Sequence, residues 1–222
     1  MGFTYAYRTD EDDDDDEDQE KRERSQPRKK PYQHYEQQFA IQHVHFYLSE
    51  FIVEPQAYGD MIHRINIATP ADVIFLHLNT HGGRLDTGIQ LINTMQNSQA
   101  KVVTVLEGMA YSLGTLIFLA GDEMVVNDHC MMMFHNFKGG ILGKGNELIS
   151  QLDATVKWFA ALAKKIYVPF LTEDEFERML RGEDLWMHSP EIRKRLDRMI
   201  KTIAAKKPLR KKPLRKVDVP LQ

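Results

Sequence analysis

The sequence has a single cysteine, Cys130, so no disulfide can form within the chain. No stretch reaches the roughly 18 consecutive apolar residues of a membrane-spanning helix, and we expect no membrane association. The first residues have neither the basic region nor the apolar region of a secretory signal. Together these absences favour a reducing, cytoplasmic compartment.

Charge is distributed unevenly along the 222 residues, although the net charge is only −3. Residues 1–35 carry 7 basic and 11 acidic side chains, with nine consecutive acids at 10–18. Residues 193–222 carry 12 basic and 2 acidic side chains. Because 42% of all residues are hydrophobic, the middle of the chain can form a core. We therefore predict a disordered acidic segment at 1–35, a globular domain at 36–200 and a disordered basic tail at 201–222.

The basic tail repeats the sequence KKPLR at 206–210 and 211–215. Each proline denies a helix one hydrogen bond, so an extended tail is expected. A nucleic-acid contact and a docking arm are two functional alternatives. The tail has no aromatic residue on which a base could stack, which favours a simple solvated tail and makes nucleic acid an unexpected partner.

Apolar strand-like runs alternate with helical patterns between residues 43 and 135. This alternation predicts an α/β fold with largely parallel strands, and the nearly continuous apolar character of the runs indicates that both sheet faces are covered. The predicted strands are 43–48, 73–79 and 102–106, with a hairpin-like pair at 124–126 and 131–134; the predicted helices are 55–67, 86–96 and 113–120.

One long helix is predicted from Asn146 to Val168, where Pro169 ends it. Its apolar residues repeat at spacings of four and three, which gives a narrow seam close to the coiled-coil period. Such a seam packs on another element, and a second subunit is one candidate. The seam consists of Leu152, Val156, Phe159, Ala163 and Ile166.

Ser112 stands where a buried strand passes into a helix. A helix N-terminus presents free N–H groups and a positive dipole end, which stabilise the oxyanion formed when a serine attacks a carbonyl. A plain N-cap is the ordinary alternative. His135 follows an apolar strand and could act as a base, and Asp184 opens a short apolar strand; each also has an ordinary structural interpretation.

Four separated blocks give these residues a common context. HLNTHGG (77–83), GMAYSLGTLIFLAG (108–121), MMMFHNFKGG (131–140) and DLWMHSPE (184–191) resemble the signature blocks of the Clp peptidase proteolytic subunit family, in the same order. The resemblance extends from about Val44 to Glu191. It implies a fold of the Clp peptidase and crotonase-like class, with repeated β-β-α units and a long protruding handle helix from Asn146.

The resemblance also implies the roles of individual residues. Ser112, His135 and Asp184 would be nucleophile, general base and orienting acid, with Glu183 as an alternative acid. The backbone N–H groups of Gly83 and Leu113 would form the oxyanion hole. The pair Gly139 and Gly140 would bind the substrate as an added strand.

From the family we further expect unfolded proteins or peptides as substrates and self-association into heptameric rings, which stack through the handle helix. A partner AAA+ unfoldase would use the ATP, so this chain itself would need no cofactor and no metal. Three alternatives stay open: a capsid-maturation or signal-peptide-peptidase-like protease, a catalytically silent ring-assembly subunit, and an acyl-CoA enzyme of the crotonase type. Retention of serine, histidine and aspartate together disfavours the last two.

The sequence departs from the family pattern at both ends. The segment Ile192–Asp197 is strongly basic where the family has a Gly-Leu-Val-Asp-like close, and the acidic head is longer than usual. Bacterial viruses often encode such divergent copies, which would act in the cytoplasm of the host cell. Two weaker site hypotheses are a metal shared by His43 and His45, and a nucleophilic Cys130; we expect neither.

Overall fold

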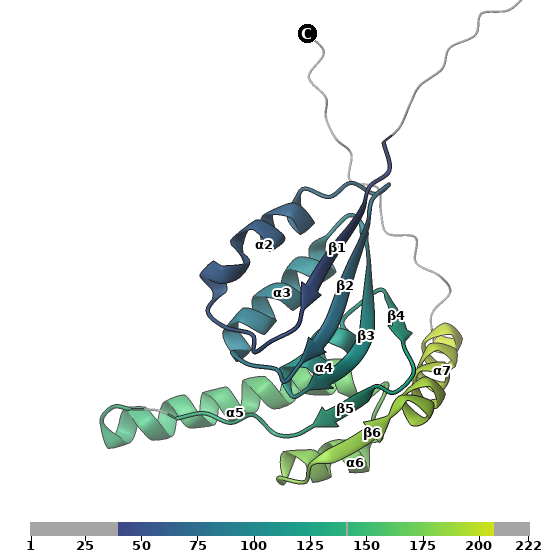
Figure 1. Cartoon of the computed structure of the whole chain (residues 1–222). Helices are drawn as coiled ribbons and strands as arrows, with labels where there is room; N and C mark the ends of the chain where they lie inside the picture. The colour runs from purple at the N-terminus through teal and green to yellow at the C-terminus, as the bar shows by residue number, and fades with distance from the viewer. Residues whose placement is uncertain (1–39, 141, 207–222) are drawn as a thin grey trace, which may run out of the picture. The chain divides into compact units, whose positions relative to one another are not determined.

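The computed structural model describes residues 40–140 and 142–206. The predicted acidic segment at 1–35 and the repeated KKPLR motif beyond residue 206 lie outside them. Within the described residues a six-stranded sheet has the order β1-β2-β3-β5-β6, and β4 also pairs with β3 (Figure 1). The strands are β1 (His43–Leu48), β2 (Val73–Thr80), β3 (Lys101–Tyr111), β4 (Glu123–Val126), β5 (Met131–Phe134) and β6 (Leu185–His188).

Helices alternate with these strands and confirm the α/β class. All pairings among β1 to β5 are parallel, and only β5 and β6 pair in antiparallel orientation. The predicted first helix begins as a 3-10 turn, η1 (Pro55–Tyr58). The α-helices are α2 (Gly59–Asn66), α3 (Leu85–Asn97), α4 (Leu113–Leu119), α5 (Gly145–Tyr167), α6 (Glu173–Leu180) and α7 (Ser189–Lys206).

The predicted hairpin between β4 and β5 is wrong. Both strands run parallel to β3: β4 pairs with Val103–Leu106 and β5 pairs with Met109–Tyr111. They therefore follow one another along the same edge of β3, with His129 in a left-handed conformation (φ 63°) between them. Because β3 serves two partners in succession, it extends to Tyr111, five residues past its predicted end at Leu106.

The expectation that both sheet faces are covered holds only in the centre. Residues Val102–Leu106 of β3 are all buried, as that expectation requires. The exposure of β1 and β2 alternates, however, with Ile74, Leu76 and Leu78 buried and the side chains between them half-buried. One face of this part of the sheet is thus open in the described chain.

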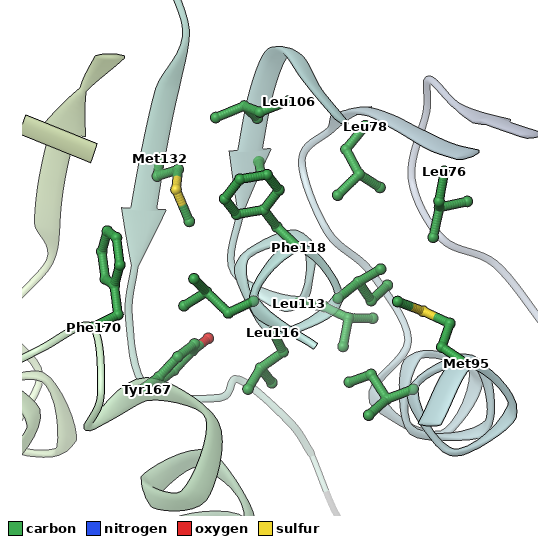
Figure 2. Packing of buried hydrophobic residues seen from close by; sticks show 14 of the residues in the cluster. Leu76, Leu78, Met95, Leu106, Leu113, Leu116, Phe118, Met132, Tyr167 and Phe170 are labelled. Carbon is green, nitrogen blue, oxygen red and sulfur yellow. The ribbon is translucent and has the colours of Figure 1, made fainter. Parts of the chain in front are cut away.

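One apolar cluster connects the sheet with α4 and the end of α5 (Figure 2). Every residue of α4 from Leu113 to Leu119 is buried, because this short helix lies between the sheet and α5. Each large apolar side chain buried in this way stabilises the fold by about 1.5–3 kcal/mol. The start of α4 is thereby held rigidly against the sheet. Labelled members of the cluster include Leu76, Leu78, Met95, Leu106, Leu113, Leu116, Phe118, Met132, Tyr167 and Phe170.

The long helix α5 has 23 residues, and its first half projects away from the sheet (Figure 1). Its buried residues, Phe159, Ala163 and Tyr167, all lie in the second half. The predicted apolar seam is therefore covered only there, while Leu152 and Val156 are 50% and 45% exposed. None of the helices in the described ranges is both long and apolar enough to cross a membrane.

Two helices that the sequence interpretation did not include complete the domain. Thr172 caps the N-terminus of α6: its hydroxyl accepts from the Glu175 N–H while the Glu175 carboxylate accepts from the Thr172 N–H. The basic segment after Glu191 forms α7, which passes the predicted domain boundary at residue 200. Ile192, Leu196 and Met199 form its buried face, so the basic segment packs as an amphipathic helix.

Candidate functional site

Three strand ends bring the candidate catalytic residues to one edge of the sheet. Ser112 directly follows β3, His135 directly follows β5 and Asp184 directly precedes β6. The β5–β6 register pairs Phe134 with Leu185, so the next position along this antiparallel ladder sets His135 opposite Asp184. Residues more than twenty positions apart in sequence are therefore neighbours in the fold.

Ser112 occupies a strained turn between β3 and α4. Its φ of 53° and ψ of −121° lie in a region that residues with a side chain rarely adopt. Its N–H donates to the carbonyl of Met133 at 2.8 Å, which fastens the turn to the strand that carries His135. In α/β-hydrolases, a serine on a sharp strand-to-helix turn presents its hydroxyl outward, in the arrangement called a nucleophile elbow.

Steric contacts explain why glycine occupies positions 82 and 83, near Ser112. Gly82 and Gly83 have φ values of 90° and 150°. A Cβ on Gly82 would lie 2.7 Å from the carbonyl oxygen of Tyr111, and one on Gly83 would lie 2.1 Å from the carbonyl oxygen of Ile52. Only glycine allows the backbone to pass this close to the Ser112 turn at Gly82 and to the Ile52 backbone at Gly83.

The two backbone N–H groups expected to form an oxyanion hole are free to bind a ligand. The Gly82 N–H is used by Thr80 Oγ1, and the Arg84 N–H by the carbonyl of Ile52. The Gly83 N–H between them, and the Leu113 N–H at the start of α4, donate to no acceptor among residues 40–140 and 142–206. Gly83, Ser112 and Leu113 all line the same pocket.

This pocket has a volume of about 460 Å³ and contains both Ser112 and His135. Its apolar wall comes from α4, α5 and the segment after β5, with the side chains of Leu116, Phe137, Phe159 and Tyr167. Arg84 and Lys138 add positive charge. A pocket that combines an apolar wall with a few polar groups suits a ligand that has both apolar and polar parts.

The surroundings of His135 favour the neutral form of its imidazole. Its pKa lies below the ordinary value, mainly because the ring is half-buried and secondly because Lys138 is close; the negative charge of Asp184 opposes both effects. A neutral imidazole can accept a proton at pH 7, which a general base requires. In the described chain no hydrogen bond joins the side chains of Ser112, His135 and Asp184.

The two neighbouring carboxylates at the start of β6 differ in their partners. Glu183 accepts from the guanidinium of Arg178, with 2.7 Å between Nε and Oε2 and a second contact from the terminal nitrogen. This guanidinium holds the pKa of Glu183 below its usual value. Asp184 is exposed and makes no ion pair within the described residues.

The expected substrate-binding pair lies beyond the pocket lining. Gly139 and Gly140 are exposed, and a Cβ on Gly140 would meet nothing within 4 Å. The chain itself therefore does not require glycine at Gly140. Binding of substrate as an added strand beside this segment stays a prediction.

The sequence analysis did not identify two buried hydroxyl groups that lie close to the Ser112 backbone. Thr115 and Tyr167 are buried and hydrogen-bonded to each other with 2.6 Å between their oxygens, next to the Ser112 carbonyl. The sequence could have indicated Thr115, because a threonine three residues after a serine can reach the serine carbonyl at the start of a helix. Tyr167 is 55 residues away from Ser112 and gave no signal in the sequence.

Two further residue groups were considered as sites: the histidines His43 and His45 as metal ligands, and Cys130 as a nucleophile. The imidazole of His45 contacts that of His77, with 2.9 Å between Nδ1 and Nε2, and does not pair with His43. The other ring nitrogen of His77, Nδ1, lies 2.7 Å from the Glu107 carboxylate. No group of three or more His, Cys, Asp or Glu that could hold a metal occurs within the described ranges. Burial raises the pKa of the Cys130 thiol, whose Sγ donates to the Leu106 carbonyl, so it packs as an inert side chain.

Comparisons with known proteins agree with the resemblance noted in the sequence. The model of the Clp protease family matches residues 53–195. An ATP-dependent Clp protease proteolytic subunit of Ostreococcus tauri is 29% identical over 97 residues, 43% of this chain and 48% of that protein. Proteolytic subunits 1 of Frankia casuarinae (29% over 122 residues, 54% and 56%) and Gloeobacter violaceus (32% over 81 residues, 36% and 41%) are similar as well. The aligned regions span about half the length of these curated relatives.

Proposed function

Because the chain belongs to the Clp protease family, we propose that it is a serine endopeptidase with Ser112 as nucleophile, His135 as general base and Asp184 as orienting acid. The observation that carries this proposal is the strained Ser112 turn. Its N–H is bonded to the strand that carries His135, and Ser112 lines one pocket together with Gly83 and with Leu113, the first residue of the buried helix α4.

The chemistry follows from these positions. Ser112 Oγ attacks the scissile carbonyl carbon while His135 accepts the hydroxyl proton. The carbonyl oxygen becomes an oxyanion, which the N–H groups of Gly83 and Leu113 stabilise. The intermediate then collapses, His135 gives its proton to the leaving amine, and an acyl-enzyme on Ser112 forms. Water hydrolyses this ester by the same steps, again with His135 as base.

For the substrate we propose unfolded protein or flexible peptide. The pocket wall of Leu116, Phe137 and Phe159 accommodates an apolar side chain, and main-chain pairing near Gly139 would accept most sequences. Such broad specificity requires enclosure, since an open peptidase would cut its neighbours. We therefore propose a ring assembly that stacks through the exposed apolar residues of α5, with delivery of unfolded chains by an AAA+ partner.

The direct test uses the full chain. Wild type and Ser112→Ala are compared on a fluorogenic peptide with an apolar residue before the scissile bond, and on one protein in its native and its reduced, alkylated state. We expect cleavage of the peptide and of the unfolded protein by wild type only. Equal cleavage by Ser112→Ala would reject Ser112 as nucleophile. Cleavage of the native protein at the same rate would reject enclosure.

A further inference from the structure

The peptide group between Ser112 and Leu113 contains two atoms that matter at the site. Its carbonyl oxygen belongs to Ser112, and its N–H is one of the two candidate oxyanion donors. Because the group is planar and trans, the C=O and the N–H point in opposite directions. Whatever fixes the direction of the Ser112 carbonyl therefore also fixes the direction of the Leu113 N–H.

Buried donors fix that carbonyl. It accepts from the Thr115 hydroxyl at 2.6 Å and from the Thr115 N–H at 3.0 Å, and the Tyr167 hydroxyl lies 3.5 Å away. Thr115 and Tyr167 are 0% and 1% exposed. Figure 2 shows Tyr167 at the end of α5 with its hydroxyl oxygen directed toward α4.

The contacts also settle where the hydroxyl protons lie. Thr115 has one hydroxyl proton, and the close contact with the Ser112 carbonyl uses it. The 2.6 Å contact between Tyr167 Oη and Thr115 Oγ1 must then take its proton from Tyr167. Burial raises the pKa of Tyr167, so the phenol keeps this proton at neutral pH.

The arrangement opposes a specific distortion. Ser112 holds a backbone conformation that residues with a side chain rarely adopt. Rotation of the Ser112–Leu113 peptide plane would relieve part of that strain and turn the N–H away from the pocket. Such a rotation would also leave the buried hydroxyl and the N–H of Thr115 without their acceptor, and would remove the acceptor on which the Tyr167–Thr115 chain of hydrogen bonds ends.

We propose that Thr115 and Tyr167 are positioning residues that hold the Ser112–Leu113 peptide group with its N–H directed at the substrate oxyanion. The inference rests on the proposed peptidase function. It adds a role for the end of α5, which reaches the nucleophile turn through the Tyr167 hydroxyl. Neither residue touches the substrate's reacting atoms in this role.

The test separates the hydroxyl from the packing of the side chain. Thr115→Val has nearly the same shape without the hydroxyl, Thr115→Ser keeps the hydroxyl, and Tyr167→Phe keeps the ring. For Thr115→Val we expect kcat to fall about 10- to 100-fold with KM almost unchanged, since only the transition state uses the oxyanion donor. Thr115→Ser should stay close to wild type. Tyr167→Phe should lower kcat roughly 2- to 10-fold, the size of one neutral hydrogen bond.

A second readout tests the oxyanion itself. A peptidyl aldehyde forms a tetrahedral adduct on Ser112, and its affinity should fall in Thr115→Val by about the same factor as kcat. The matched control is Thr104→Val, because Thr104 is also fully buried and donates to a backbone carbonyl, that of Phe118, away from the pocket. It should leave kcat and aldehyde affinity unchanged.

Several outcomes would overturn the inference. A Thr115→Val chain with wild-type kcat would do so, and so would Thr115→Ser with as large a loss as Thr115→Val. If Thr115→Val does not fold, as judged by thermal unfolding, Tyr167→Phe decides alone: an unchanged kcat and aldehyde affinity reject the inference. A wild type without peptidase activity would instead reject the proposed function, and the inference with it.

Discussion

Arg178 holds the carboxylate of Glu183 at the turn into β6, through Nε and a terminal nitrogen of its guanidinium. The next residue, Asp184, sits opposite His135 in the extended β5–β6 register. Of the two adjacent acids, Glu183 is thus occupied by α6 and Asp184 remains free for the histidine. The sequence left open whether Asp184 or Glu183 orients His135, and the ion pair of Glu183 favours Asp184.

We predict that Asp184→Asn lowers kcat about 10⁴-fold, by analogy with other triads in which the acid orients the histidine. Glu183→Gln should change kcat by no more than about twofold, because it only weakens an exposed ion pair with Arg178. Steady-state kinetics on one peptide with both variants decide the matter. A large loss in Glu183→Gln together with a nearly normal Asp184→Asn would exchange the roles of the two acids.

The acidic limb of the pH–rate profile should depend on Lys138. The charge of Lys138 lowers the pKa of His135, so its removal raises that pKa. Because the histidine must be neutral to act as base, Lys138→Gln should move the acidic limb of kcat/KM to higher pH. Lys138 is exposed, so the difference should shrink in 1 M salt. Superimposable profiles at low salt would show that Lys138 does not act on the base.

The ion pair between α6 and α7 should make stability depend on pH. Arg195 contacts both carboxylate oxygens of Glu175 at 2.7 and 2.8 Å and lowers the pKa of this acid to about 2. A carboxylate with a lowered folded-state pKa stabilises the fold above its unfolded pKa, near 4.5, and loses that contribution as the pH falls toward 2.

Glu175→Gln should therefore reduce the free energy of unfolding by about 1–3 kcal/mol at pH 7, and by clearly less at pH 3.5. Glutamine keeps an acceptor for the Thr172 N–H, so the helix cap is retained. Urea unfolding of both chains at the two pH values measures the difference. A destabilisation that is equal at pH 7 and pH 3.5 would mean that the charge of Glu175 is not responsible.

The exposed half of α5 should carry ring stacking. Ile149, Leu152 and Val156 are 73%, 50% and 45% exposed and lie on one face of the helix. Replacing both Leu152 and Val156 by glutamate should reduce the mass of the assembly in sedimentation velocity, because charge on an apolar contact is costly. Gln151→Glu adds charge beside that face and should leave the mass unchanged. An identical mass distribution in all three chains would assign stacking to another surface.

The elements that were predicted well are those whose signal is local. The strand of Val73–Thr80 and the helix of α5 follow from apolar runs, periodicity and Pro169, and each lies within a few residues of its expected bounds. The false hairpin had the opposite cause. Two short strands joined by a turn look the same in sequence whether they pair with each other or follow one another along β3, since only tertiary contacts distinguish the two cases.

In the candidate site, too, features with a local sequence signal were predicted and features that depend on tertiary contacts were not. The motif around Ser112 and the glycines before it could be recognised, because a strained turn and a close backbone approach restrict residue type locally. The support from Tyr167 could not, since a tyrosine at the end of a helix looks like any core residue. The basic segment after Glu191 was noted only as a departure from the family pattern, whereas Arg195 and Arg198 of α7 bind Glu175 and the Phe170 carbonyl within the fold.

Covalent labelling by a fluorophosphonate probe tests most directly whether Ser112 is an activated nucleophile. The probe reacts with a serine only where a base and an oxyanion site are arranged beside it. We predict a single adduct on the peptide that contains Ser112, found by mass spectrometry of the assembled wild type, and no adduct in Ser112→Ala. An assembled wild type without adduct, or an adduct that persists in Ser112→Ala, would contradict the assignment of this chain as a serine peptidase with Ser112 at its centre.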